Sequence, residues 1–133
     1  MGAEAVPNAL RGAGMMLTTM EEAGYPRDAK DVDWIPEVAA RGWVILTKDK
    51  NIRRTSLELE AVLASDARFF TLGKASYSAA AMAAIVLHHR DTIERLVLYR
   101  QAPVIVQINK GEVLLRGKDG QLRRVKRKTL RRR

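Results

Sequence analysis

The chain has 133 residues, of which 47% are hydrophobic, so it is long enough for one domain with a real core and too short for two of ordinary size. It contains no cysteine, which excludes a disulfide framework, a thiolate metal site and a cysteine nucleophile and fits a reducing, cytoplasmic location. Nothing resembles a signal peptide, and the longest apolar stretch, residues 79–87, is far shorter than a membrane span, so we expect no membrane association.

The net charge of +9 is concentrated at the C-terminus. Residues 116–133 hold ten Lys or Arg and one acid, Asp119, whereas the rest of the chain holds fourteen charges of each sign. We therefore divide the chain into a domain, residues 1–116, and a basic C-terminal tail, residues 117–133. The tail has few apolar residues, and two interpretations stay open, a solvated disordered arm and an RNA-binding segment.

The first elements are short. Residues 3–13 predict a helix, because their apolar residues are spaced for one face and Gly14 stands where a helix commonly ends. Residues 15–20 are apolar and predict a first strand.

A second helix is predicted to begin at an aspartate and to end near Gly42. Pro36 decides which aspartate caps it, since proline is tolerated where its missing N–H would have no intrahelical partner. With Asp33 as the N-cap, Pro36 is the third residue of the helix and is tolerated, so we predict Asp33 as the cap and Asp31 as the unengaged acid. Capping is the plain structural interpretation of both acids.

The next stretch contains the main candidate site. Residues 43–46 are apolar and rich in β-branched and aromatic residues, which predicts a central parallel strand buried on both faces. Residues 47–50, Thr-Lys-Asp-Lys, follow at its carboxyl end, where open α/β sheets place their ligand crevice. Asp49 has no helix to cap there. We expect up to three carboxylates, those of Asp31, Asp33 and Asp49, to converge at this edge.

Downstream of this stretch, helices and strands alternate. A capping-box pattern at Thr55 and Glu58 predicts a third helix, and residues 68–72 predict a strand. Ser78 is the predicted N-cap of the longest helix, whose apolar residues keep the helical period over about five turns, as far as Val97.

This long helix contains two adjacent histidines, His88 and His89, which point in different directions and cannot both serve one site. We predict both as surface residues without a catalytic role. Residues 104–108 and 112–116 flank a turn in a hairpin pattern. The order of elements predicts an α/β fold with a mainly parallel sheet. No phosphate-binding glycine loop, zinc pattern or Ser-centred nucleophile motif is present, which excludes most small-molecule enzyme classes.

The pattern D-x-x-W-I-P, with its acid eighteen positions before the acid of V-I-L-T-K-D-K-N-I-R-R, resembles the PIN-like domain of VapC-type toxins. The resemblance covers roughly residues 4–116 and is most specific between Asp31 and Arg54. It implies a three-layer α/β/α sandwich with a mainly parallel sheet and a C-terminal β-hairpin. It also implies metal-dependent ribonuclease activity, and many members are toxins of type II toxin–antitoxin pairs, held inactive by a cognate antitoxin.

Carried over residue by residue, the resemblance makes Asp31 and Asp49 catalytic metal ligands. Asp33 is a candidate third ligand, because it stands beside Asp31 at the predicted helix start. Carboxylates suit Mg²⁺ or Mn²⁺, which would activate a water and stabilise charge on the scissile phosphate. The residues that match the family's basic run and are implied to contact RNA phosphates are Lys50, Arg53 and Arg54. A solvated loop is the alternative interpretation of that run.

The sequence departs from the family pattern at its beginning. That pattern starts with a strand ending in an aspartate before the first helix, whereas this sequence starts at Met1-Gly2, already at the helix. We therefore expect a strand and one metal-binding acid to be missing, and little or no Mg²⁺-dependent ribonuclease activity from these 133 residues. The alternative function is a non-catalytic protein on a PIN-like scaffold that binds RNA or an antitoxin. Homodimer formation stays open.

Overall fold

The computed structural model describes residues 10–12, 14, 18–19, 22–25, 31–47, 56–72, 78–117 and 119–126, with the backbone alone for residues 31–32 and 56–58. The elements in chain order are α2 (Asp31–Ala40), β1 (Val44–Thr47), α3 (Ser56–Ala64), β2 (Arg68–Leu72), α4 (Ala79–His88), α5 (Arg90–Tyr99), β3 (Val104–Ile108), β4 (Val113–Arg116) and β5 (Leu122–Arg124). None of the helices in these ranges is long and apolar enough to cross a membrane.

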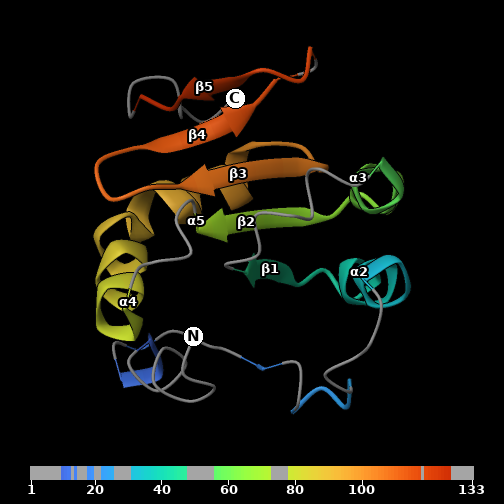
Figure 1. Cartoon of the computed structure of the whole chain (residues 1–133), viewed down its shortest axis with the longest axis horizontal. Coiled ribbons are helices and arrows are strands. Elements are labelled where there is room, and N and C mark those ends of the chain that lie inside the picture. The colour runs from blue at the N-terminus through green and yellow to red at the C-terminus, as the bar shows by residue number, and fades with distance from the viewer. Residues whose placement is uncertain are drawn as a thin grey trace.

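The strands form one sheet in the order β1-β2-β3-β4-β5 (Figure 1). β1, β2 and β3 are parallel, and β4 and β5 each run antiparallel to the preceding strand. The predicted mainly parallel sheet is confirmed, as is the hairpin that β3 and β4 form. β5 lies inside the stretch that was predicted to be a tail, so residues 122–124 belong to the sheet, while residues 127–133 lie outside the described part of the chain.

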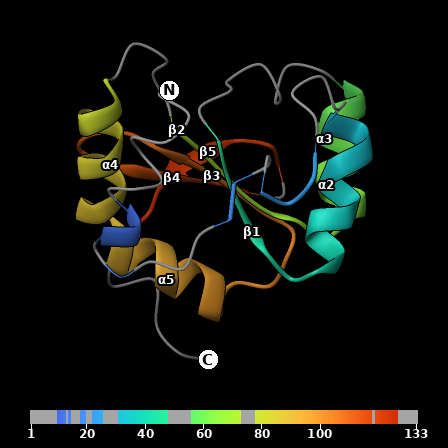
Figure 2. The ribbon, with the colours of Figure 1, turned by 90° about the horizontal axis from the view of Figure 1, so that it is seen from below.

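Helices cover both faces of the sheet, α2 and α3 on one side and α4 and α5 on the other (Figure 2). The reason is visible in β2, where Phe69 and Phe70 are adjacent and therefore point to opposite faces. Phe69 packs with Ile35 of α2 and Val62 of α3, and Phe70 packs in a second core that includes Leu96 of α5. The α/β/α sandwich is therefore confirmed, with one hydrophobic core on each side of the sheet.

The predicted long helix is broken into α4 and α5 at His89. Ser78 caps α4 as predicted, because its Oγ accepts a hydrogen bond from the Ala81 amide at 3.1 Å. The prediction that His89 is a surface residue is wrong: its side chain is buried, and Nε2 lies 2.9 Å from the Asn109 carbonyl oxygen and 3.3 Å from that of Lys110. These contacts hold the junction of the two helices against the β3–β4 turn.

β1 was predicted to be a central strand buried on both faces, and this is wrong for the described residues. β1 pairs with β2 and with no other described strand, and Trp43 and Val44 are 39% and 40% exposed. Ile45 alone of its residues is fully buried, against α2 and α3. The amino-acid composition of the strand indicates that it prefers an extended backbone. It does not indicate how many other strands pair with it.

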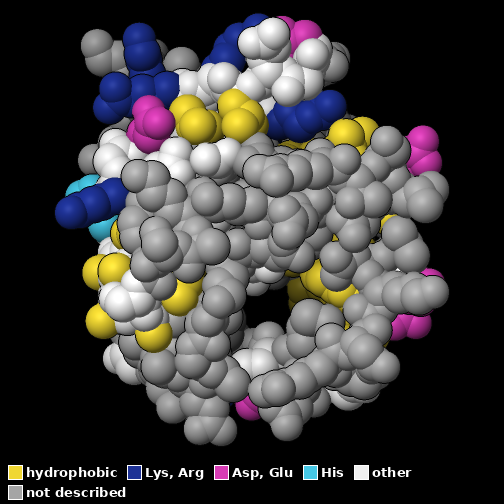
Figure 3. Space-filling model, viewed as in Figure 1, with side chains coloured by type: hydrophobic (Ala, Val, Ile, Leu, Met, Phe, Trp, Pro, Cys, Tyr) yellow, Lys and Arg dark blue, Asp and Glu magenta, His cyan; other side chains and the backbone are white. Residues whose placement is uncertain are grey.

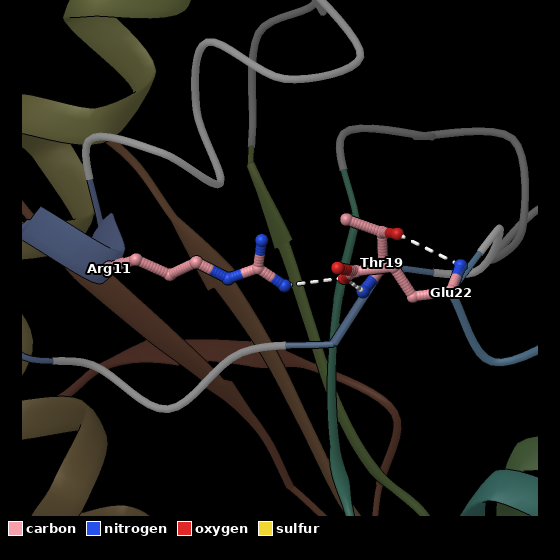
Figure 4. Close-up of polar contacts among 3 residues, drawn as sticks. All are labelled: Arg11, Thr19 and Glu22. Carbon is pink, nitrogen blue, oxygen red and sulfur yellow. Dashed lines mark hydrogen bonds and ion pairs between the residues drawn. The ribbon is translucent and has the colours of Figure 1, made fainter.

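The strand predicted over residues 15–20 is not found at the two of its residues that are described. Thr19 instead precedes a turn at residues 22–24. The Glu22 amide donates to the Thr19 hydroxyl, and the Thr19 amide donates to the Glu22 carboxylate (Figure 4). Arg11 also forms an ion pair with Glu22. The Thr19 amide and the Arg11 guanidinium lower the pKa of the Glu22 carboxyl. Glu22 thus connects Arg11 and Thr19 near the start of the described chain.

The two-core arrangement predicts a large difference between leucines. Leu72→Ala should lower the free energy of unfolding by about 2–5 kcal/mol, because Leu72 is 1% exposed and its truncation leaves a cavity. Leu98→Ala, at a side chain that is 71% exposed, should change it by less than about 0.5 kcal/mol. Denaturant unfolding measures both, and similar losses for the two variants would contradict the described core.

Candidate active site

Three parallel strands end at one edge of the sheet, at Thr47, Leu72 and Ile108. α2 leads into β1 through a tight turn at Gly42, whose φ of +74° is a conformation that other residues rarely adopt. α2 consequently runs back against the direction of β1, and the start of α2 lies on the side of the molecule where β1 ends (Figure 2). The topology therefore places the start of α2 and the carboxyl ends of the strands on the same side.

A row of polar residues crosses the sheet at this edge. Thr47 pairs in register with Thr71, and Thr71 pairs with Gln107. Two positions earlier, the in-register residues are the apolar Ile45, Phe69 and Ile105, which pack against α2 and α3. Because alternate residues of a strand share a face, the polar row faces the same side as α2 and lies just beyond its core. We call Thr47, Thr71 and Gln107 the polar row.

The members of the polar row differ in burial. Thr71 is buried, and its hydroxyl donates a long hydrogen bond of 3.4 Å to the Val106 carbonyl. Gln107 is half-buried, and its Nε2 donates to the Asn109 Oδ1 at 3.3 Å. Hydroxyl and amide oxygens are hard ligands of the kind that Mg²⁺ prefers. The edge therefore offers oxygen chemistry beside the predicted carboxylates.

Thr71 and Gln107 were not among the predicted site residues, although the sequence carries a signal for them. The three parallel strands read VILT, RFFTL and VIVQI, and the fourth residue of each is polar and follows two apolar residues. Aligning the strands by their fourth residue would have produced the polar row.

The predicted cap of α2 is wrong. The helix begins at Asp31, so Asp33 is its third residue and Pro36 lies inside it. The proline removes one helical hydrogen bond, but Trp34 and Ile35 are buried in the core, and that burial favours the longer helix. The burial of Trp34 and Ile35 therefore outweighs the cost of a proline beyond the first turn of the helix, on which the prediction was based.

The longer helix also separates two of the predicted metal ligands. Residues two apart on a helix are about 200° apart around its axis, so positions 31 and 33 lie on different faces. Position 31 falls in the same row as Ile35, which faces the sheet, whereas Asp33 is exposed in the row of Glu37. Glu37 accepts a hydrogen bond from the Tyr25 hydroxyl at 2.6 Å, which raises the pKa of Tyr25.

The other predicted site residues, Asp49, Lys50, Arg53 and Arg54, lie outside the described residues, as does the side chain of Asp31. Their convergence stays a prediction. Chain connectivity places Asp49 two residues beyond Thr47, in the segment between β1 and α3. Among the described side chains, no group of three or more His, Asp or Glu is close enough to hold a metal ion.

Comparison with known proteins identifies the family. The model of the PIN like domain family matches residues 2–74, more than half of the chain, including the positions of Asp31 and Asp49. A protein of Mycobacterium tuberculosis (strain ATCC 25618 / H37Rv) described as "Putative ribonuclease VapC45" is 34% identical over 117 residues, which cover 86% of this chain and 84% of that protein. No solved structure gave a significant match. The fold, the residues between Asp31 and Arg54 and both matches agree, and the chain belongs to the PIN-like domain family as a VapC-type PIN domain.

Proposed function

We propose that this chain is a metal-dependent endoribonuclease, a hydrolase of phosphodiester bonds, and the toxin of a type II toxin–antitoxin pair. The observation that carries the proposal is the shared edge, where three parallel strands end in the polar row and α2 begins with Asp31. Membership of the VapC-type PIN domains supports it, as does the ribonuclease named among its relatives.

Asp31 and Asp49 would hold Mg²⁺ or Mn²⁺ in this proposal, with Asp33 as the more distant candidate. The fit is chemical, since the described residues of the polar row offer hydroxyl and amide oxygens and no sulfur or imidazole. When bound, the metal supplies a water of lowered pKa and charge stabilisation at phosphate. Lys50, Arg53 and Arg54 would position the RNA backbone by contacts to its phosphates.

The metal ligands can be tested by stability as well as by cleavage. Mg²⁺ at about 100 times its dissociation constant should stabilise the folded chain by about 2.7 kcal/mol, because it binds the folded state alone. Asp31→Asn and Asp49→Asn should abolish this stabilisation. In a longer form that carries the family's first strand and its aspartate, they should lower Mg²⁺-dependent cleavage of a mixed RNA pool more than about 100-fold. Glu60→Gln is the matched control and should retain both, since Glu60 is an exposed acid on α3 that is not among the candidate ligands.

Metal titration by thermal unfolding, with and without chelator, gives the first readout, and gel analysis of the RNA gives the second. Cleavage that survives Asp49→Asn would refute the proposed ligands. RNA binding with neither a metal effect nor cleavage would favour the non-catalytic scaffold over the nuclease.

A cognate antitoxin is the second partner that we propose, and it would cover the acidic site with a basic side chain. Co-purification from the native host should then recover a small protein that protects Lys50 from amine-modifying reagents. Lys110 is the matched control, because it is exposed in the β3–β4 turn and should stay reactive. Recovery of the chain alone, with harmless expression, would count against an antitoxin.

A further inference from the structure

Two adjacent arginines on β5 have different surroundings. Arg123 forms an ion pair with Asp119, with Nη1 3.0 Å from Oδ1 and Nη2 2.5 Å from Oδ2. This pair lies over Gly117, and it holds the pKa of the Asp119 carboxyl far below its ordinary value. Arg124 is exposed, and its side chain has neither a hydrogen bond nor an ion pair with any described residue. The two arginines point to opposite sides of the sheet, because they are neighbours on one strand.

Arg124 lies on the same line of in-register residues as the polar row. Gln107 is in register with Leu114, and Leu114 is in register with Arg124, so one line of side chains runs across all five strands from Thr47 to Arg124. With strands roughly 4.8 Å apart, the two ends of this line are about 19 Å apart. β5 also runs in the same direction as β1, β2 and β3, so the chain leaves it at the edge where those strands end.

The part of this face that belongs to β4 and β5 is not covered by the described helices. The core beneath α2 and α3 draws its buried residues from β1, β2 and β3 and from neither β4 nor β5. The residues of the uncovered part alternate between apolar and basic, as Leu114, Arg116, Leu122 and Arg124. Figure 3 shows dark blue basic side chains beside yellow hydrophobic ones over the end of the molecule where β4 and β5 lie.

We propose that Arg124 binds a backbone phosphate of an RNA strand that lies across the carboxyl edge of the sheet, from β1 to β5. The inference rests on the proposed function for its RNA substrate. A guanidinium offers paired N–H donors that match two phosphate oxygens, and such contacts position a strand without reading its bases. About 19 Å corresponds to roughly five or six phosphates of a stacked strand.

The described surface favours an RNA strand over a protein partner at this place. Protein interfaces need an apolar centre, and the exposed large hydrophobic side chains, Trp43, Val44 and Leu98, belong to β1, its preceding turn and α5. Leu114 and Leu122 are half-buried between basic neighbours. The charge around them is complementary to an extended polyanion.

The test compares the two arginines in the full chain. Binding of a fluorescein-labelled 12-nucleotide single-stranded RNA of mixed sequence is measured by anisotropy over a salt series, with chelator present so that no metal-dependent cleavage occurs. Arg124→Gln should weaken binding about two- to fivefold at low salt and reduce the slope of log K against log salt by about 0.7, the value for one lost phosphate contact. Arg123→Gln makes the same change of charge one residue away and should leave the slope unchanged.

Arg124→Lys should keep the wild-type slope, because the charge is retained, and circular dichroism checks that each variant is folded. Equal slopes for Arg124→Gln, Arg123→Gln and the wild type would overturn the proposal. So would a co-purifying protein whose capture depends on Arg124 while RNA binding does not. A slope difference in a chain that Mg²⁺ does not stabilise would reject the proposed metal-dependent nuclease and keep this phosphate contact.

Discussion

Side-chain alternation along β2 is the constraint on which both cores depend. Phe69 and Phe70 are nearly inaccessible to solvent, and each fixes the position of a helical layer. β2 also pairs with β1 and β3, so its register decides which residues of those strands lie beside one another. The polar row is a consequence of that register, since Thr71 is its middle member. A slip of one residue would turn Thr71 toward the wrong core and divide the row.

The elements whose limits depend on residues close in sequence were predicted correctly. The limits of β2, the turn between β3 and β4 and the Ser78 cap follow from strand preference, turn residues and a hydroxyl at a helix start. The break at His89 does not, because it depends on carbonyl groups twenty residues further along the chain. The place of β1 at the edge of the described sheet depends on which strands lie beside it, and no property of VILT reports that.

The candidate site likewise contains residues that were predicted from the sequence and residues that were not. Asp31 and Asp49 were predicted from their positions at a helix start and beyond a strand end, and the resemblance implied their role as metal ligands. The described backbone places the start of α2 on the side where β1 ends. Thr71 and Gln107 were missed because neither residue alone indicates a site. The polar row is recognised only when each is considered with the in-register residue of the neighbouring strand. The predicted cap at Asp33 failed because a helix can contain a proline when enough of its surface is buried.

Gly117 gives the β4–β5 turn a further property. A methyl group at this position would lie 2.6 Å from Nη1 of Arg123, which is closer than such atoms pack, and 3.0 Å from Oδ1 of Asp119, which is a tight contact. The smallest side chain would therefore require the Arg123 guanidinium to shift from its position over Gly117. Glycine at position 117 thus leaves the space in which the Arg123–Asp119 ion pair forms, whereas no described residue neutralises the charge of Arg124 on the same strand.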